Sequence, residues 1–148
     1  MTKLIKTVGE ESVGMQNPLI KLVMIQFAAY TVFGMLGFAA WAITSSNNVS
    51  ILEVIFGEYI RGHFVRWTAH FPFWGVFIFT SAILSFCAVW LLQSSRREGG
   101  YLGILSFLIG FVTNILLAQN ILVHSLIGFL IGWTLLSPLA ITWKNLKP

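Results

Sequence analysis

Long apolar stretches, separated by short polar segments, dominate the pattern along the chain. A helix of about 20 apolar residues crosses the roughly 30 Å hydrocarbon core of a bilayer, since each residue adds about 1.5 Å. We expect transmembrane helices at residues 22–44, 71–93, 101–118 and 121–143. The pattern therefore predicts an all-α polytopic membrane protein, with residues 1–148 forming one membrane domain behind a polar N-terminal tail at 1–17.

The last two stretches together form the longest apolar segment. No Asp, Glu, Lys or Arg lies between Tyr101 and Trp143, and the polar interruption Ala118-Gln119-Asn120 divides the segment. We expect a transmembrane hairpin with a very short turn.

Small or weakly polar residues recur every three or four positions on both helices of this hairpin, so each set shares one helix face. The first helix carries Gly103, Ser106, Gly110 and Asn114, and the second carries Ser125, Gly128 and Gly132. Helices in lipid associate through close approach at small residues and through interhelical hydrogen bonds. We expect the two faces to meet, pairing Asn114 with His124 and Ser125, Gly110 with Gly128, and Ser106 with Gly132. Asn114 would make a packing hydrogen bond, with a functional role as the alternative.

Three residues within the predicted spans are unusual for a transmembrane helix. Trp133 lies near the middle of the last span, where its indole N–H needs an acceptor that lipid does not provide. Pro138 follows in the same span and should kink the helix near Thr134. We expect Gln26, near one end of the first span, to reach the head groups.

The segment at residues 51–66 combines apolar residues with charges at Glu53, Glu58, Arg61 and Arg66. It is too charged to span, so it predicts an amphipathic helix lying in the membrane interface. Internal glycines weaken helices, and we expect a break near Gly57 or Gly62. Glu58 and Arg61 are spaced for an ion pair.

Charge sets the expected orientation. Only 9% of residues are charged, against about 25% in soluble domains. Seven of the nine Lys and Arg residues fall on the side of the two termini: Lys3, Lys6, Lys21, Arg96, Arg97, Lys144 and Lys147. The positive-inside rule therefore predicts cytoplasmic termini in a cell or cytoplasmic membrane. No aromatic-basic stripe accompanies these cations, which argues against nucleic acid as a partner. The bilayer and other membrane subunits are the expected partners.

The three histidines, His63, His70 and His124, are expected on the outer side of the membrane. Imidazoles with Glu58 nearby are a possible ligand set for copper, zinc or iron, and His70 with His124 for haem. The alternative is that histidine is simply accommodated at a membrane interface. We predict no cofactor, and keep a metal or haem at these histidines as the rival hypothesis.

The opening of the second span, Phe71-Pro72-Phe73-Trp74-Gly75, resembles the start of the second helix in the CD20-like four-helix membrane family. The loops and the single cysteine differ from that family, and the resemblance implies no functional residue.

The absence of charged residues in the spans and of catalytic motifs limits the classes of function that the sequence supports. The predicted spans contain no acidic or basic residue, whereas ion-coupled transporters carry such groups at mid-membrane. No nucleophile–base pair, phosphate loop or zincin motif is present. We expect a small non-catalytic accessory subunit of a larger membrane complex, such as a respiratory or oxygenase-type enzyme. The alternatives are a homo-oligomeric channel or carrier for a neutral solute, built around the glycine faces and Asn114, and an outer-leaflet metal or haem protein.

Overall fold

The computed structural model describes residues 17–46, 49–118 and 121–148, and these residues are helical with no strand. The helices are α2 (Pro18–Ser45), α3 (Val49–His70), α4 (Trp74–Gln93), α5 (Arg97–Leu117), α6 (Ile121–Thr142) and the short 3-10 helix η1 (Trp143–Asn145). Four of them, α2, α4, α5 and α6, are long and apolar enough to cross a membrane. The all-α prediction with four spans is confirmed. The predicted tail lies outside the described residues except for Asn17, whose side chain caps α2 by accepting from the Leu19 amide at 3.0 Å.

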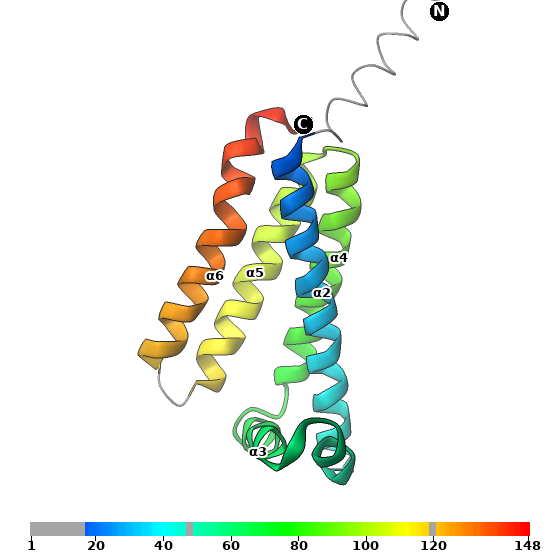
Figure 1. Cartoon of the computed structure of the whole chain (residues 1–148), viewed down its shortest axis with the longest axis vertical. Helices are drawn as coiled ribbons and strands as arrows, with labels where there is room; N and C mark the ends of the chain where they lie inside the picture. The colour runs from blue at the N-terminus through cyan, green and yellow to red at the C-terminus, as the bar shows by residue number, and fades with distance from the viewer. Residues whose placement is uncertain (1–16, 47–48, 119–120) are drawn as a thin grey trace, which may run out of the picture.

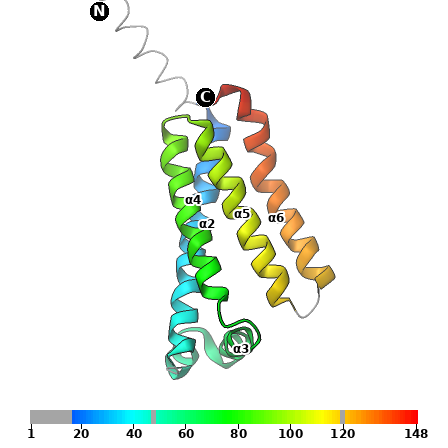
Figure 2. The same ribbon diagram turned by 180° about the vertical axis from the view of Figure 1, so that it is seen from behind.

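Figures 1 and 2 show α2, α4 and α5 running side by side, with α6 beside α5. Helix α6 also contacts α2. The start of α2, the turn between α4 and α5, and the C-terminus all lie at one end of the bundle, called here the terminal end. Helix α3 lies across the opposite end, called here the far end. This arrangement places a separate helix between the first two spans, as the sequence predicts.

Close backbone approach holds α2, α4 and α5 together. A Cβ atom added at Gly34 of α2 would lie 2.8 Å from the Cβ of Ala82 of α4. One added at Gly99 of α5 would lie 2.8 Å from both the Ala88 carbonyl oxygen and the Leu92 amide nitrogen of α4. The glycines therefore let helices approach more closely than a methyl group would allow, which is how helices without a hydrophobic driving force associate in lipid.

Serine hydroxyls connect the same three helices. Ser81 of α4 donates to the Ser106 carbonyl at 2.8 Å, and Ser106 of α5 donates back to the Ser81 carbonyl at 2.7 Å. Ser85 donates to the Phe27 carbonyl of α2 at 2.8 Å. All three serines are buried, so each hydroxyl bonds a neighbouring helix instead of its own.

Helix α3 is broken at Gly57, as the sequence predicts at one of two glycines. The φ and ψ of Gly57 are 79° and 163°, a conformation that is essentially restricted to glycine. The break turns the first segment toward the second, so Arg61 pairs with Glu53 at 2.9 Å. The predicted pairing of Arg61 with Glu58 is wrong, because it assumed one continuous helix through Gly57.

Pro138 does not interrupt α6, which is helical from Ile121 to Thr142. Proline has no N–H to donate to the carbonyl four residues earlier. That carbonyl belongs to Thr134, and it accepts instead from the Gln26 Nε2 of α2 at 3.2 Å. The prediction that Gln26 reaches the head groups is therefore wrong, because an unpaired carbonyl on α6 lies within its reach.

The residues after η1 are bonded to the turn between α4 and α5. The Lys147 amide donates to the Ser95 carbonyl at 2.7 Å, and the Arg97 amide donates to the Lys147 carbonyl at 2.9 Å. Leu146 is buried between them. These contacts fix the terminal end of α6 against the three-helix core.

Candidate functional site

The small-residue face of α5 packs onto the core and not onto α6. Gly103 lies under the Phe27 ring, and Gly110 lies against the Tyr30 hydroxyl. Ser106 bonds Ser81 of α4. The predicted pairings of Gly110 with Gly128 and of Ser106 with Gly132 are therefore wrong. The spacing identified a close-contact face correctly, but α2 and α4 compete for it and occupy it.

The glycines of α6 contact aromatic rings of the neighbouring helix, α5. Gly128 and Gly132 are buried, and a Cβ atom at either would collide with the ring of Phe111 or Phe107, respectively, on α5. The two rings stack at a centroid distance of 5.8 Å. Helices α5 and α6 therefore contact each other through the Phe107 and Phe111 rings of α5, which pack against Gly132 and Gly128 of α6. The rings hold the two backbones apart and leave open space beside them.

Asn114 and Ser125 are both half-buried, near the turn of the hairpin. The side chain of His124 is outside the described set, so its predicted pairing with Asn114 is a prediction still. Thr113, next to Asn114 on α5, is buried, and its hydroxyl donates to the Ile109 carbonyl of the same helix at 2.8 Å.

The histidines of α3 do not converge. The His63 ring packs against Tyr59 and Trp67, and Arg66 Nη2 lies 3.4 Å from His63 Nδ1. His70 is exposed at the end of α3, about 10 Å further along the helix axis. Within the described residues, no three His, Cys, Asp or Glu side chains are grouped to hold a metal ion. A guanidinium beside His63 also disfavours a second cation there.

Trp133 of α6 is 65% exposed, although it lies well inside the span. Its ring contacts Phe129 at a centroid distance of 6.3 Å. Across the described ranges, the structure shows no hydrogen-bond acceptor for its indole N–H. This residue faces an open groove of about 580 Å³ between α5 and α6, lined by Phe107, Leu108, Phe111, Phe129, Gly132, Trp133, Leu136, Ser137, Ala140 and Ile141.

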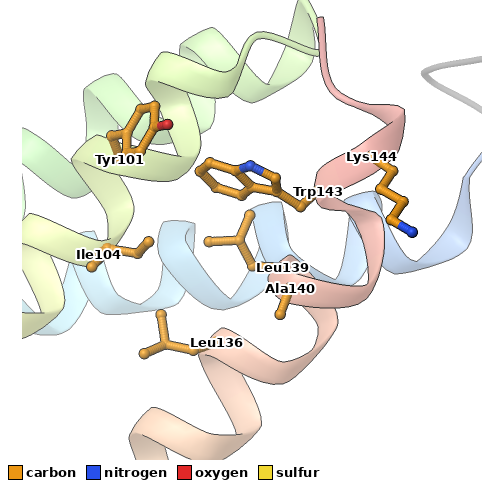
Figure 3. A pocket seen from close by; sticks show the side chains of 7 residues that line it. All are labelled: Tyr101, Ile104, Leu136, Leu139, Ala140, Trp143 and Lys144. Atoms are coloured by element: carbon orange, nitrogen blue, oxygen red, sulfur yellow. The ribbon is translucent and has the colours of Figure 1, made fainter. Parts of the chain in front are cut away.

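A second pocket, of about 460 Å³, extends this groove to the terminal end. Leu136 and Ala140 line both pockets, so the two adjoin at these residues. Figure 3 shows the second pocket, with Tyr101 of α5 facing the Trp143 ring and Lys144 at the rim. The Tyr101 and Trp143 rings meet edge to face at 5.0 Å. We call the two pockets together the α5–α6 groove.

Charge is distributed unequally between the two ends. Among the described residues, the terminal end carries five cations, Lys21, Arg96, Arg97, Lys144 and Lys147, and one acid, Glu98. The far end carries Glu53, Glu58, Arg61 and Arg66, which balance. Within the described part of the chain, the excess of positive charge therefore lies at the end where the α5–α6 groove opens beside Lys144.

These features support binding better than reaction. The core hydroxyls of the serines are engaged by backbone carbonyls, and the exposed groove is lined almost entirely by carbon. Sequence reasoning did not identify the groove, because it depends on which residues α5 turns toward α2 and α4. It also missed the Gln26–Thr134 bond, although Pro138 alone indicates that the Thr134 carbonyl needs another donor.

The comparisons with known proteins add no functional residue. The resemblance of the Phe71–Gly75 opening to CD20-like proteins stays a local one. The chain matches no protein-family model, no curated protein and no solved structure.

Proposed function

We propose that this chain is a small non-catalytic accessory subunit of a larger integral membrane complex. The observation that carries the proposal is Trp133. Its ring is largely exposed, about 18 Å from the start of α6 by helix rise. Lipid chains offer no acceptor for its N–H, and an unmet donor in hydrocarbon costs several kcal/mol. A helix of another subunit, carrying a hydroxyl or a free carbonyl, would supply the acceptor.

The apolar surface around Trp133 supports the same proposal. Phe129, Leu130 and Leu126 are each more than half exposed on α6. Membrane subunits recognise each other by shape and by hydrogen bonds, because apolar surface alone does not distinguish a partner from lipid. The recesses between the aromatic side chains would provide the complementary shape, and the unpaired indole N–H of Trp133 would provide the hydrogen bond.

The rival channel hypothesis is less well supported by the same structure. That channel was expected to be built around the glycine faces and Asn114. Gly103, Ser106 and Gly110 are buried against other helices of this chain, and Asn114 is half-buried. A pore between copies would have to use other surfaces. The metal rival requires convergence of the histidines, and His63 and His70 lie apart along α3. The haem pairing of His70 with His124 stays a hypothesis, because the His124 side chain lies outside the described residues.

We further propose that the terminal end is cytoplasmic, as the excess of cations favours. Helix α3 then lies at the outer interface, where its exposed apolar residues Val54, Ile55 and Tyr59 contact lipid or the same partner.

Gentle native extraction, followed by size analysis and mass spectrometry, tests the proposal. The wild-type chain should migrate with larger membrane subunits at fixed stoichiometry. Trp133→Ala should lose them, and Trp133→Phe, which keeps a ring but no N–H, should lose most of them. Trp90→Ala is the matched control, because Trp90 is 68% exposed near the end of α4, where head groups are within reach. Migration of the wild-type chain alone would refute the proposal.

A further inference from the structure

The α5–α6 groove has the dimensions of a site for one lipid chain. Its lining runs along α6 and η1 from Phe129 to Lys144, which is about 22 Å by helix rise. One leaflet contributes about 15 Å of hydrocarbon. A chain entering at the terminal end therefore fits within the groove and ends beside the Phe107 and Phe111 rings.

The second pocket is apolar inside and becomes aromatic and then charged at its opening, at the terminal end. Below the rim it is lined by Ile104, Leu136, Leu139 and Ala140, all apolar. At the rim stand Tyr101 and Trp143, whose rings suit the level of the head groups. Lys144, which follows Trp143 in the sequence, is exposed. Figure 3 shows its side chain extending outward from the end of the helix.

Charge favours one kind of occupant. A partner helix would fill the groove without needing a cation at its mouth, whereas a lipid phosphate requires one. Among the described residues, the terminal end holds five cations and one acid, Glu98, and basic pockets between membrane helices on the cytoplasmic side bind anionic head groups. The order along the groove is hydrocarbon, aromatic rim and then cation, and this order matches the order within a lipid.

We propose that the α5–α6 groove binds a lipid with an anionic phosphate head group, its chain lying along Leu136 and Ala140 and its phosphate held by Lys144. The groove includes Phe129 and Trp133, which also belong to the surface proposed for the partner, so the test uses the isolated chain, in which no partner is present.

The test uses the purified chain in nanodiscs containing equal amounts of phosphatidylglycerol and phosphatidylcholine. Native mass spectrometry after release counts the lipid that stays bound. The wild-type chain should retain phosphatidylglycerol in preference to phosphatidylcholine. Ala140→Phe fills the groove at one of the two residues common to both pockets and should abolish that retention. Ala29→Phe is the matched control, at an exposed position on α2, and should retain lipid as the wild type does.

A charge pair separates a specific site from a generally basic surface. Lys144→Gln should reduce the preference for phosphatidylglycerol about fivefold, as expected for one cation near a head group. Lys147→Gln removes an equal charge from the same end but outside the groove lining, and should change the preference much less. Equal effects of the two variants would overturn the site.

Two further outcomes would also overturn it. One is wild-type retention of lipid by Ala140→Phe, with Ala140→Leu as a smaller filling variant if the phenylalanine variant does not fold. The other is release of partner subunits by Ala140→Phe in native extracts with no change in lipid binding by the isolated chain, which would assign the groove to a protein helix.

Discussion

Glycines in this protein perform different tasks at different positions, and the same exchange to alanine distinguishes them. Gly57 has a backbone conformation that side chains disfavour, while Gly62, one turn later in α3, is helical with nothing within 4 Å of an added Cβ. The first is required by the chain's path, and the second only weakens the helix.

Gly57→Ala should destabilise the protein by about 1–3 kcal/mol, because alanine must adopt a strained conformation or straighten α3. Straightening would also separate Arg61 from Glu53. Gly62→Ala should be neutral or stabilise by up to about 1 kcal/mol. Denaturant unfolding in mixed micelles measures both. Equal effects of the two exchanges would contradict a special role for Gly57.

Gly99→Ala should be more damaging than Gly37→Ala. At Gly99 the new methyl would lie 2.8 Å from backbone atoms of α4, which cannot move without shifting the helix. At Gly37 it would lie 3.3 Å from the Cγ2 methyl group of Ile78, a side-chain contact that a shift of a few tenths of an ångström would relieve. We expect a loss of about 1–3 kcal/mol for Gly99 and little change for Gly37, by the same unfolding measurement. A ranking in the opposite order would show that α4 and α5 do not approach closely at Gly99.

At the level of elements, α6 depends on α2 through one polar contact. Pro138 leaves the Thr134 carbonyl unpaired within its own helix, and Gln26 supplies the donor. The contact has a cost of its own, because the Gln26 Oε1 is buried without a hydrogen-bond partner. The net gain is therefore modest, in keeping with about 0.6 kcal/mol for typical polar contacts between membrane helices.

A double-mutant cycle isolates this contact. Gln26→Met should destabilise the wild-type chain, because it leaves the Thr134 carbonyl in an apolar setting. The same exchange should have a smaller effect, or none, in a Pro138→Ala background, where α6 can bond that carbonyl itself. We expect a coupling energy of about 1 kcal/mol. Additive effects in the cycle would show that Gln26 and Pro138 act independently.

The elements themselves could be predicted from the sequence, while their neighbours could not. Runs of apolar residues determine four spans whatever surrounds them, and Gly57 marks a break because its freedom is local. The partner of the α5 small-residue face is different. Gly103 and Gly110 fit any close neighbour, and the large Phe27 and Tyr30 side chains of a distant segment fill the space first. Likewise, nothing near Glu53 in sequence indicates that Arg61 turns back to it.

The molecule as a whole has two unlike ends. The terminal end is strongly basic and holds the mouth of the α5–α6 groove, and the far end carries α3 with balanced charges. A membrane containing the four spans would separate these ends onto its two sides.

Labelling of single cysteines tests this separation. Cys87, the one cysteine, is first replaced by alanine. Glu58→Cys and Lys147→Cys then place a thiol on exposed positions at opposite ends. A membrane-impermeant maleimide should label Glu58→Cys in intact cells and Lys147→Cys only after permeabilisation. The reverse pattern would invert the proposed orientation, and labelling of both from one side would contradict four crossings.

The contact between Gln26 and Thr134 joins residues 108 positions apart. The order in which the helices are synthesised therefore affects how α6 inserts into the membrane. Translation proceeds from the N-terminus, so α2 is in the bilayer before the segment with Pro138 is made. The donor is therefore waiting when the proline-disrupted carbonyl enters hydrocarbon. A rearranged gene that encoded α6 ahead of α2 would insert that carbonyl with no donor available, and its product would meet a barrier to insertion that the natural order avoids.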